Sequence, residues 1–289
     1  MTLKNQKMEF LEHFHQALKS PVSKIATKSV SHQAKAKLVN KLIAAEHATL
    51  VNATTFPIDD SAKQQALLIL QYCTSVISLE YRHEVWPYEY MALSRRVGEL
   101  WERFCRAAWD HPSLPNVQRM DAPLFPDVAR KIRARIESYI SADVRKSASV
   151  DLNTVFDLIG EINMREDEMF LSNGRPHVID FKSGFGSNEK GNTLRLLTVG
   201  RAYKLWNPNT RLLLLVRQEQ NNNYLNVIER SGLWEVFCGD AAYKEIDMLT
   251  GSNTNAMRGG MIDFKSDLSD DFWSDLSSHL TDLTSYLEW

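Results

Sequence analysis

The residues that most constrain the fold of this chain are Ser-Asn-Gly-Arg at positions 172–175, which separate two extended apolar runs. Both central residues of a type I′ turn need a positive φ, and Asn-Gly is a pair that favours this turn strongly. The sequence therefore predicts a β-hairpin whose two-residue loop is Asn173-Gly174. Counting outward from the loop sets Asp167 opposite Asp180.

This register gathers charge on one face of the hairpin. Directly opposed residues point to the same face, and the period of two along a strand adds Lys182 to Asp167 and Asp180. Two apposed carboxylates repel one another unless a proton or a cation lies between them. Mg²⁺ takes oxygen ligands, often only one or two of them from protein carboxylates, so we expect Mg²⁺ here. Lys182 could then orient or deprotonate an attacking water, or stabilise charge developing on phosphorus.

The same residues carry a resemblance to a known family. Asp167, followed after twelve residues by Asp180-Phe181-Lys182, is similar to the motif of the PD-(D/E)xK nucleases. The resemblance implies Mg²⁺-dependent hydrolysis of DNA phosphodiesters, with Asp167 and Asp180 as metal ligands and Lys182 serving the water. It also implies a restriction-endonuclease-like core.

A second element of the resemblance is a strong helix predicted over residues 92–109. Gly98 and Glu102 share one flank of this helix because they are four residues apart. Gly-x-x-x-Glu here is similar to the first helix of PD-(D/E)xK nucleases, where a glutamate often leans over the metal site. The resemblance implies Glu102 as a further catalytic and metal-binding residue, and a solvated helix face is the alternative.

The first carboxylate of the site has competitors among the neighbouring acidic residues, which are Asp157, Glu161, Glu166 and Glu168. The first two lie on a segment with helical spacing, and a one-residue slip of the hairpin would substitute either of the last two. We prefer Asp167 because it falls opposite Asp180 in the predicted register.

The chain also repeats the second half of the motif. Ile-Asp-Phe-Lys-Ser at residues 262–266 is identical to residues 179–183, so Asp263 and Lys265 could also form the site. No hairpin with an opposed acidic residue precedes the second copy, and residues 252–260 before it are predicted to form a loop. We therefore interpret the second copy as a decoy.

The order of elements predicts a mixed α/β (α+β) fold, with a mixed central sheet flanked by helices. Residues 1–85 are predicted to be a helical amino-terminal region that embraces DNA or mediates dimerisation. Residues 86–251 would form the nuclease core, with a proline-rich loop at 111–127, helices at 128–141, 193–205, 225–232 and 241–250, and buried strands at 211–217 and 233–239. Residues 252–289 would be a loop and an acidic carboxy-terminal helix that packs on the core.

Polar and basic side chains near the hairpin are candidates for DNA contacts. They follow the hairpin itself, occupy the next predicted helix and leave the end of the next strand. The candidates are Ser183, Asn188, Lys190, Asn192, Arg195, Arg201, Gln218, Gln220 and Asn222. For each of them a solvated loop or helix face is the alternative.

Composition restricts the cellular setting. Three cysteines without a CxxC pattern favour neither a disulfide framework nor a zinc site. No signal peptide or apolar run of membrane length is found, so we expect a soluble, cytoplasmic protein that binds no membrane. The net charge of −2 means that any DNA-binding surface must be local.

Together these features favour a site-specific endonuclease that cuts double-stranded DNA, similar to type II restriction enzymes. One centre cuts one strand, so cutting both strands suggests a homodimer on a palindromic site. The resemblance also implies a companion DNA methyltransferase, without a stable complex between the two. The alternatives are a repair, transposon-end or structure-selective nuclease of the same fold, and a catalytically silent DNA-binding protein.

Overall fold

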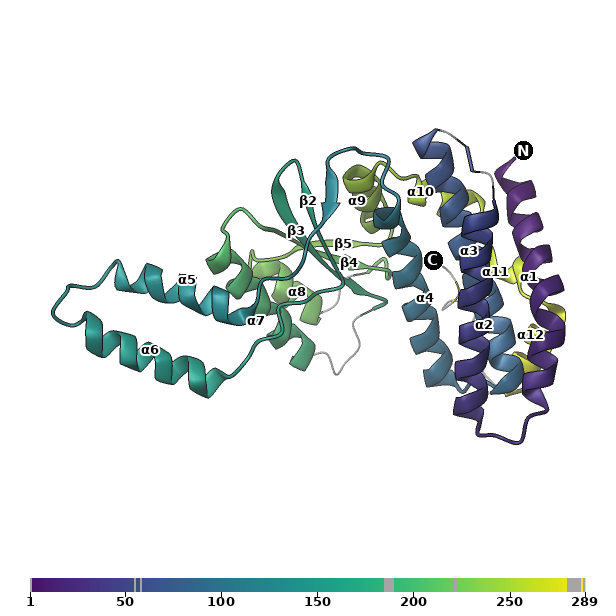
Figure 1. The fold of residues 1–289 in the computed structure, drawn as a ribbon, viewed down its shortest axis with the longest axis horizontal. Helices are drawn as coiled ribbons and strands as arrows, with labels where there is room; N and C mark the ends of the chain where they lie inside the picture. The colour runs from purple at the N-terminus through teal and green to yellow at the C-terminus, as the bar shows by residue number, and fades with distance from the viewer. Residues whose placement is uncertain are drawn as a thin grey trace. The chain divides into compact units, whose positions relative to one another are not determined.

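The computed structural model describes residues 2–54, 56–57, 59–184, 190–220, 223–279, 287 and 289. Over these residues the chain forms twelve helices and one five-stranded mixed sheet (Figure 1), which confirms the predicted mixed α/β class and the helical amino-terminal region. Contacts divide the chain into two compact units, residues 1–115 with 243–289 and residues 116–242. The sequence predicted domain boundaries after residues 85 and 251. These differ from the boundaries of the two units, and the predicted division stays a prediction.

The first unit is built from helices. Its four long helices are α1 (Leu3–Ala26), α2 (His32–Ala53), α3 (Asp60–Val85) and α4 (Tyr90–Asp110). The first three begin at side-chain caps, because Thr2, Ser31 and Asp59 each accept a hydrogen bond from a main-chain N–H of the first turn. α3 is buried along most of its length, and the other three helices pack against it. It is therefore the centre of this unit.

Four shorter helices follow near the carboxy terminus: α9 (Asp240–Thr250), α10 (Thr254–Gly260), α11 (Phe264–Asp267) and α12 (Asp270–His279). The loop predicted for residues 252–260 is wrong, because α10 occupies most of it. Asp247 of α9 accepts hydrogen bonds from the main-chain N–H groups of Thr254, at 2.6 Å, and Asn255, at 3.1 Å. These are the donors that a helix leaves unsatisfied at its start. Residues 280–286 and 288 of the predicted carboxy-terminal helix lie outside the described residues.

The second unit contains the sheet, whose strands are β1 (Val117–Arg119), β2 (Glu168–Ser172), β3 (Arg175–Lys182), β4 (Arg211–Val216) and β5 (Glu235–Cys238). They lie side by side in chain order. β1 pairs with β2 and β2 pairs with β3 in antiparallel directions, whereas β3, β4 and β5 run parallel to one another. The parallel strands are connected through α7 (Lys190–Trp206) and α8 (Asn223–Arg230). The carboxyl ends of β3, β4 and β5 consequently meet at one edge of the sheet.

β1 was not expected, because it lies in the proline-rich segment predicted to be a loop. It has only three residues and pairs with β2 at the edge of the sheet, where Arg119 is opposite Phe170. A hydrogen bond of 2.9 Å from the Met120 N–H to the Met169 carbonyl extends this pairing. A strand this short has no recognisable alternation, so only its partner strand defines it.

The hydrophobic core of the second unit lies between one face of the sheet and the helices α5 (Phe125–Glu137), α7 and α8. Val178 of β3, Leu214 of β4 and Leu196 and Tyr203 of α7 are all buried in it. Trp234 is also buried there and donates a 2.8 Å hydrogen bond from Nε1 to the Leu196 carbonyl. These contacts fix α7 against the strands that carry the predicted site.

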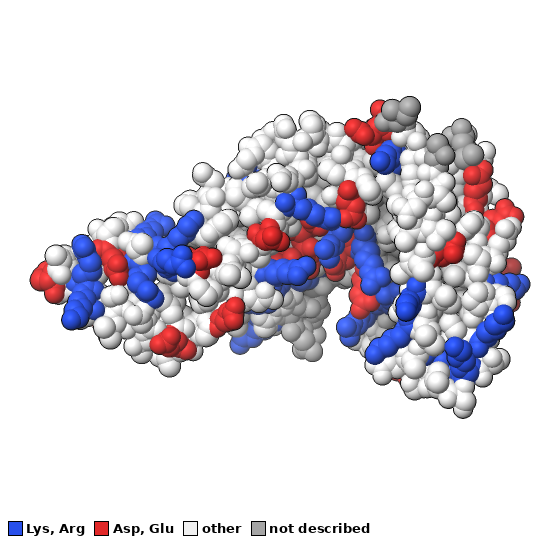
Figure 2. Space-filling model, in the orientation of Figure 1, with Lys and Arg blue, Asp and Glu red and all other residues white. Residues whose placement is uncertain are grey.

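α5 and α6 (Arg145–Ile159) lie side by side as a helical hairpin (Figure 1). No described residue of α6 is fully buried, and the helix contacts α5 through Phe156 and Phe125, whose ring centroids are 6.3 Å apart. Figure 2 shows Lys and Arg side chains over these helices interspersed with Asp and Glu, as in the 2.9 Å pair of Arg130 with Asp127. Within the described ranges no helix of the chain is both long and apolar enough to cross a bilayer.

Candidate functional site

The predicted hairpin is present with the predicted register. Asn173 has φ of 51° and Gly174 has φ of 74°, which are the two positive values that a type I′ turn requires. Glu168 pairs with Ile179, and Phe170 with His177, as counting from the turn predicts. Pairing of the two strands begins at Glu168, so Asp167 lies immediately before the ladder.

Alternation along β3 places Asp180 and Lys182 on the face that carries Val178 and is covered by α7. Asp180 is opposite Leu214 of the parallel strand β4 and is only 1% exposed. Both charged residues lie at the carboxyl end of β3, where ligands bind in open sheets with parallel strands. The hairpin therefore delivers a carboxylate and an ammonium group to a buried position at the sheet edge.

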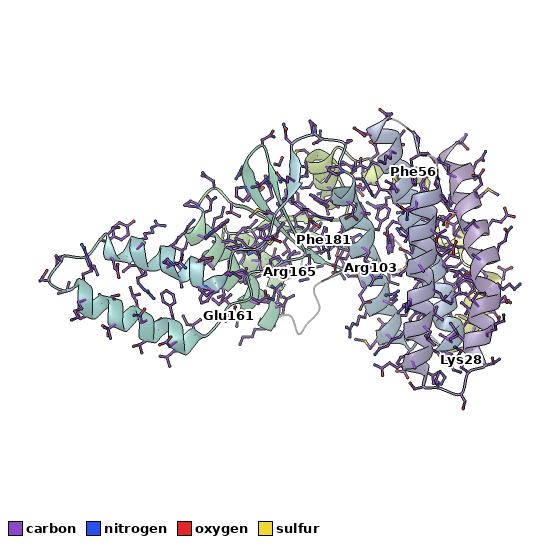
Figure 3. All side chains as sticks on the ribbon, viewed as in Figure 1. Lys28, Phe56, Arg103, Glu161, Arg165 and Phe181 are labelled. Carbon is purple, nitrogen blue, oxygen red and sulfur yellow. The ribbon has the colours of Figure 1, made fainter. Side chains whose placement is uncertain are left out.

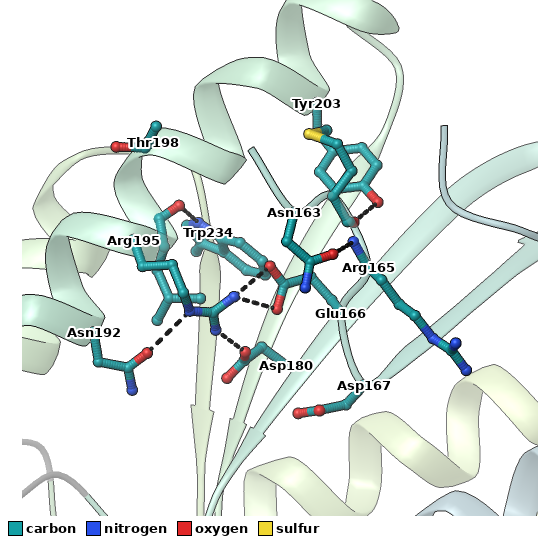
Figure 4. A network of polar contacts seen from close by, with 12 residues as sticks. Asn163, Arg165, Glu166, Asp167, Asp180, Asn192, Arg195, Thr198, Tyr203 and Trp234 are labelled. Carbon is teal, nitrogen blue, oxygen red and sulfur yellow. Dashed lines mark hydrogen bonds and ion pairs between the residues drawn. The ribbon is translucent and has the colours of Figure 1, made fainter. Parts of the chain in front are cut away.

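Arg195 of α7 joins Asp180 to a second buried carboxylate, that of Glu166 (Figure 4). Its Nη1 donates to both oxygens of Glu166, at 2.7 and 2.9 Å, and its Nη2 donates to Oδ2 of Asp180 at 2.5 Å. Its Nε donates to Oδ1 of Asn192 at 3.3 Å. The two carboxylates are 2% exposed and the Arg195 side chain is 41% exposed. One guanidinium group thus bridges two carboxylates that water barely reaches.

The electrostatics of the pair follow from its burial. Burial first, and then the neighbouring Asp180 carboxyl group, raise the pKa of Glu166 to about 8, although the Arg195 guanidinium opposes the rise. Ionising Glu166 beside Asp180 therefore costs free energy even with one arginine present. A site of this kind favours the binding of a further proton or cation.

Lys182 supplies the second internal cation. Its Nζ forms an ion pair with Oδ1 of Asp180 and donates to the Phe181 carbonyl at 3.3 Å. Apart from this ion pair, Oδ1 of Asp180 accepts no hydrogen bond from the described residues. Asp180 Oδ1 is therefore a buried acceptor with remaining capacity for a ligand.

Asp167 lies just outside the ladder, and its role as a metal ligand stays a prediction. Its Oδ2 accepts a 2.7 Å hydrogen bond from the Phe181 N–H, a donor that lies beyond the last pair of the β2–β3 ladder. The side chain thus extends the edge of β3 where β2 has ended. The structure brings Glu166 to Asp180 through Arg195, and holds Asp167 beside them against the main chain.

The other acidic competitors are not part of this cluster. Glu168 points to the opposite face of the sheet, where Arg119 of β1 binds both its oxygens, at 2.7 and 2.9 Å. Glu161 is exposed on the segment that leads from α6 to β2. Figure 3 labels Glu161 and Arg165 on this segment. Asp157 is exposed on α6.

Glu102 lies on α4, in the first unit, as predicted for a helix upstream of the hairpin. It pairs with Arg106 one turn later on the same helix at 3.3 Å. This contact belongs to the helix surface, and the contribution of Glu102 to the metal site stays a prediction.

The candidates for DNA contacts occupy several positions, and Asn188 and Asn222 lie outside the described residues. Lys190 and Asn192 lie in the first turn of α7, before residue 193, where the sequence predicted that this helix would begin, and Arg201 is exposed further along it. Ser183 Oγ accepts a 3.1 Å hydrogen bond from Arg217, and Gln218 and Gln220 are exposed after β4. Arg195 contacts the buried carboxylates directly, a role that the sequence did not reveal.

The repeated motif has a different structure. Asp263 precedes α11 and its carboxylate accepts a 3.2 Å hydrogen bond from the Ser266 N–H, so it is a helix cap. Its own N–H donates to the Tyr72 hydroxyl at 3.0 Å, and Lys265 is exposed. The sequence predicted that no opposed strand would accompany this copy.

Tyr203 of α7 is a supporting residue that sequence reasoning missed. Its hydroxyl donates to the Met164 carbonyl and lies 3.3 Å from the Met169 sulfur. Met164 and Met169 lie on either side of Glu166 in the sequence, and Figure 4 shows Tyr203 beside the segment that carries Asn163, Arg165 and Glu166. Tyr203 therefore fixes the segment that delivers Glu166, and only its helical spacing from Leu196 and Val199 marked it as a core residue.

Over the described part of the chain, no group of three or more His, Cys, Asp or Glu side chains is arranged to hold a metal ion. A hard cation such as Mg²⁺ commonly uses one or two carboxylates and completes its shell with water and phosphate, so the pair of Asp180 and Glu166 suits it. The remaining capacity of Asp180 Oδ1 supports this fit. Compared with models of protein families, with curated proteins and with solved structures, the chain matches none.

Proposed function

We propose that this protein is a Mg²⁺-dependent endonuclease that hydrolyses phosphodiester bonds of double-stranded DNA, on a restriction-endonuclease-like core. The observation that carries the proposal is the buried carboxylate pair of Asp180 and Glu166 with Lys182 at the carboxyl end of β3. Burying two like charges is expensive, so such a pair in a small polar cluster is a candidate for function rather than for stability.

The metal would be held by Asp180 and Glu166, with Asp167 as a further carboxylate on the residue next to Glu166. When bound, Mg²⁺ polarises the phosphoryl oxygens and lowers the pKa of a coordinated water. Glu166 takes the place that the sequence assigned to Asp167. Both lie on the short segment before β2, so the motif keeps its spacing within one residue.

Lys182 supplies a positive charge at the reacting centre. Its ammonium group is held between Asp180 and the Phe181 carbonyl, so its position is fixed before any substrate binds. A preorganised cation stabilises the negative charge that develops on phosphorus and can orient the attacking water. The water oxygen forms the new bond to phosphorus, the bond to one ester oxygen breaks, and that oxygen takes up a proton.

DNA is the proposed substrate because of the motif and the polar surface around it. The helix that contacts the carboxylate pair, α7, carries cationic and amide side chains of the kind that bind phosphate. They are Lys190, Asn192, Arg195 and Arg201. One centre cuts one strand, so a homodimer is proposed for double-strand cleavage. A methyltransferase acting on the same sequence would protect the host DNA.

The test is digestion of plasmid DNA of known sequence with Mg²⁺, followed by mapping of the ends. Defined fragments should appear with wild type and disappear with Asp180→Asn and Lys182→Met, while Asp263→Asn should cut as wild type does. Cleavage at junctions or free ends, regardless of sequence, would favour a structure-selective nuclease. Equal cleavage by wild type and Asp180→Asn would refute the site, and duplex binding without any metal-dependent cleavage would indicate a silent DNA-binding protein.

A further inference from the structure

The carboxylate pair already has its own cations. Arg195 contacts both oxygens of Glu166 and Oδ2 of Asp180, at 2.5 to 2.9 Å, and Lys182 contacts Oδ1 of Asp180. All four carboxylate oxygens therefore lie against an internal cation. When both carboxyl groups are ionised, two negative charges face two positive charges, so the ionised cluster is formally neutral without any metal.

A divalent cation would disturb this balance. It needs carboxylate lone pairs that the guanidinium group now uses, and it would leave the cluster with an excess of two positive charges. One internal cation must then withdraw. Lys182 is two residues from Asp180 on the same rigid strand and its side chain is 19% exposed. Arg195 comes from a different element, α7, and its side chain is 41% exposed, so it has both a separate anchor and access to water.

We propose that Arg195 is an exchangeable counter-cation, which holds the carboxylate pair when no metal is bound and is displaced from it when a divalent cation binds. This inference rests on the proposed function and adds a form of regulation to the same site. Once displaced, the guanidinium group remains on the second turn of α7 and can bind a phosphate of the substrate in a bidentate manner. Metal and phosphate would consequently bind cooperatively, because the phosphate gives the displaced arginine a new anionic partner.

The exchange is tested by calorimetric titration of the full chain with Mn²⁺, without DNA, for wild type and Arg195→Met. All proteins are titrated in the same buffer at the same pH, so that protons compete with the metal equally in each. Removing three charged hydrogen bonds that compete with the metal should tighten Mn²⁺ binding by about tenfold or more. Arg130→Met is the matched control, because Arg130 is an exposed arginine of the same unit that pairs with Asp127 on α5, and the affinity of this variant should equal that of wild type.

The outcomes separate the inference from the proposed function. If wild type binds Mn²⁺, Asp180→Asn does not, and Arg195→Met binds no more tightly than wild type, the exchange is refuted and the metal site survives. If neither wild type nor Arg195→Met binds Mn²⁺, the proposed function fails together with the exchange. Should Arg195→Met not fold, Arg195→Lys carries the test. Lysine keeps the positive charge but lacks the bidentate N–H groups of the guanidinium. The affinity of this variant for Mn²⁺ should exceed that of wild type, whereas an unchanged affinity would refute the exchange.

A second titration tests the phosphate partner. A DNA dinucleotide, which offers one phosphodiester, should tighten Mn²⁺ binding to wild type and leave the affinity of Arg195→Met unchanged. Equal tightening in both proteins would show that another group binds the phosphate, and would overturn this part of the inference.

Discussion

Gly200 controls how closely α7 packs against Trp234 within the second unit, and its replacement by alanine tests that packing. A Cβ atom at this position would lie 2.6 Å from Nε1 of Trp234. The indole cannot withdraw easily, because it is 2% exposed and its Nε1 donates to the Leu196 carbonyl at 2.8 Å. A clash of this kind must move either the ring or the helix that carries Arg195.

The magnitude follows from three opposing contributions. Overpacking a buried site costs about 1–3 kcal/mol, and loss of the Trp234 hydrogen bond adds about 0.5–1.5 kcal/mol. Alanine in place of glycine inside a helix returns about 1 kcal/mol. The clash is therefore larger than the gain in helix propensity, and we expect Gly200→Ala to lower the unfolding free energy by about 2 kcal/mol.

The assay is urea denaturation, combined with amide hydrogen exchange of peptides that cover α7. Gly191→Ala is the matched control on the same helix, because a Cβ there meets no atom within 4 Å. It should leave stability unchanged or raise it by up to about 1 kcal/mol. If Gly200→Ala were as stable as Gly191→Ala, with equal protection of α7, the close approach of Trp234 to this helix would be refuted.

Three further predictions concern other parts of the chain. Burial lowers the pKa of His177 below its ordinary 6.5, so the unfolded chain takes up this proton first, and the unfolding free energy should decrease as the pH falls through 6.5 and below. Denaturation at several pH values should show a shallower decrease for His177→Gln, and parallel curves would contradict this. Arg119→Met leaves the buried Glu168 without its bidentate partner and should cost about 1–3 kcal/mol, while Arg119→Met with Glu168→Met should recover part of the loss in the same assay. Asp263→Ala removes a helix cap and should cost about 1 kcal/mol in thermal denaturation while DNA cleavage is retained; loss of cleavage would move the site to the second copy of the motif.

The hairpin could be predicted in detail because its determinants are local. Asn173 and Gly174 have positive φ angles, which asparagine and glycine adopt more readily than other residues, and from there the register follows by counting. The buried strand β4 was also predictable, since a continuous run of aliphatic residues is typical of a strand covered on both faces. Local sequence thus specified the strands that carry Asp180 and Lys182.

The partners of the acidic residues could not be predicted, because they come from elements distant in the sequence. Arg195 reaches Glu166 across 29 residues, and Arg119 reaches Glu168 across 49. The choice between Glu166 and Asp167 also depends on where pairing of β2 begins, which is fixed by the edge strand β1 and by the hydrogen bond from Phe181. Two adjacent acidic residues offer the same letters to a motif, and only tertiary contacts distinguish them.

The two copies of Ile-Asp-Phe-Lys-Ser show what the motif needs beyond its own residues. In the first copy the pentapeptide continues a strand that has β2 on one side and β4 on the other, so the aspartate is buried and must find cations. In the second copy α10 precedes the pentapeptide, and the aspartate is an exposed N-cap of α11. Identical residues therefore hold opposite positions, one buried at the centre of a sheet and one exposed at a helix start. The chemistry proposed for Asp180 arises from its two neighbouring strands and from Arg195, and a match of three letters supports a metal site only where such neighbours are present.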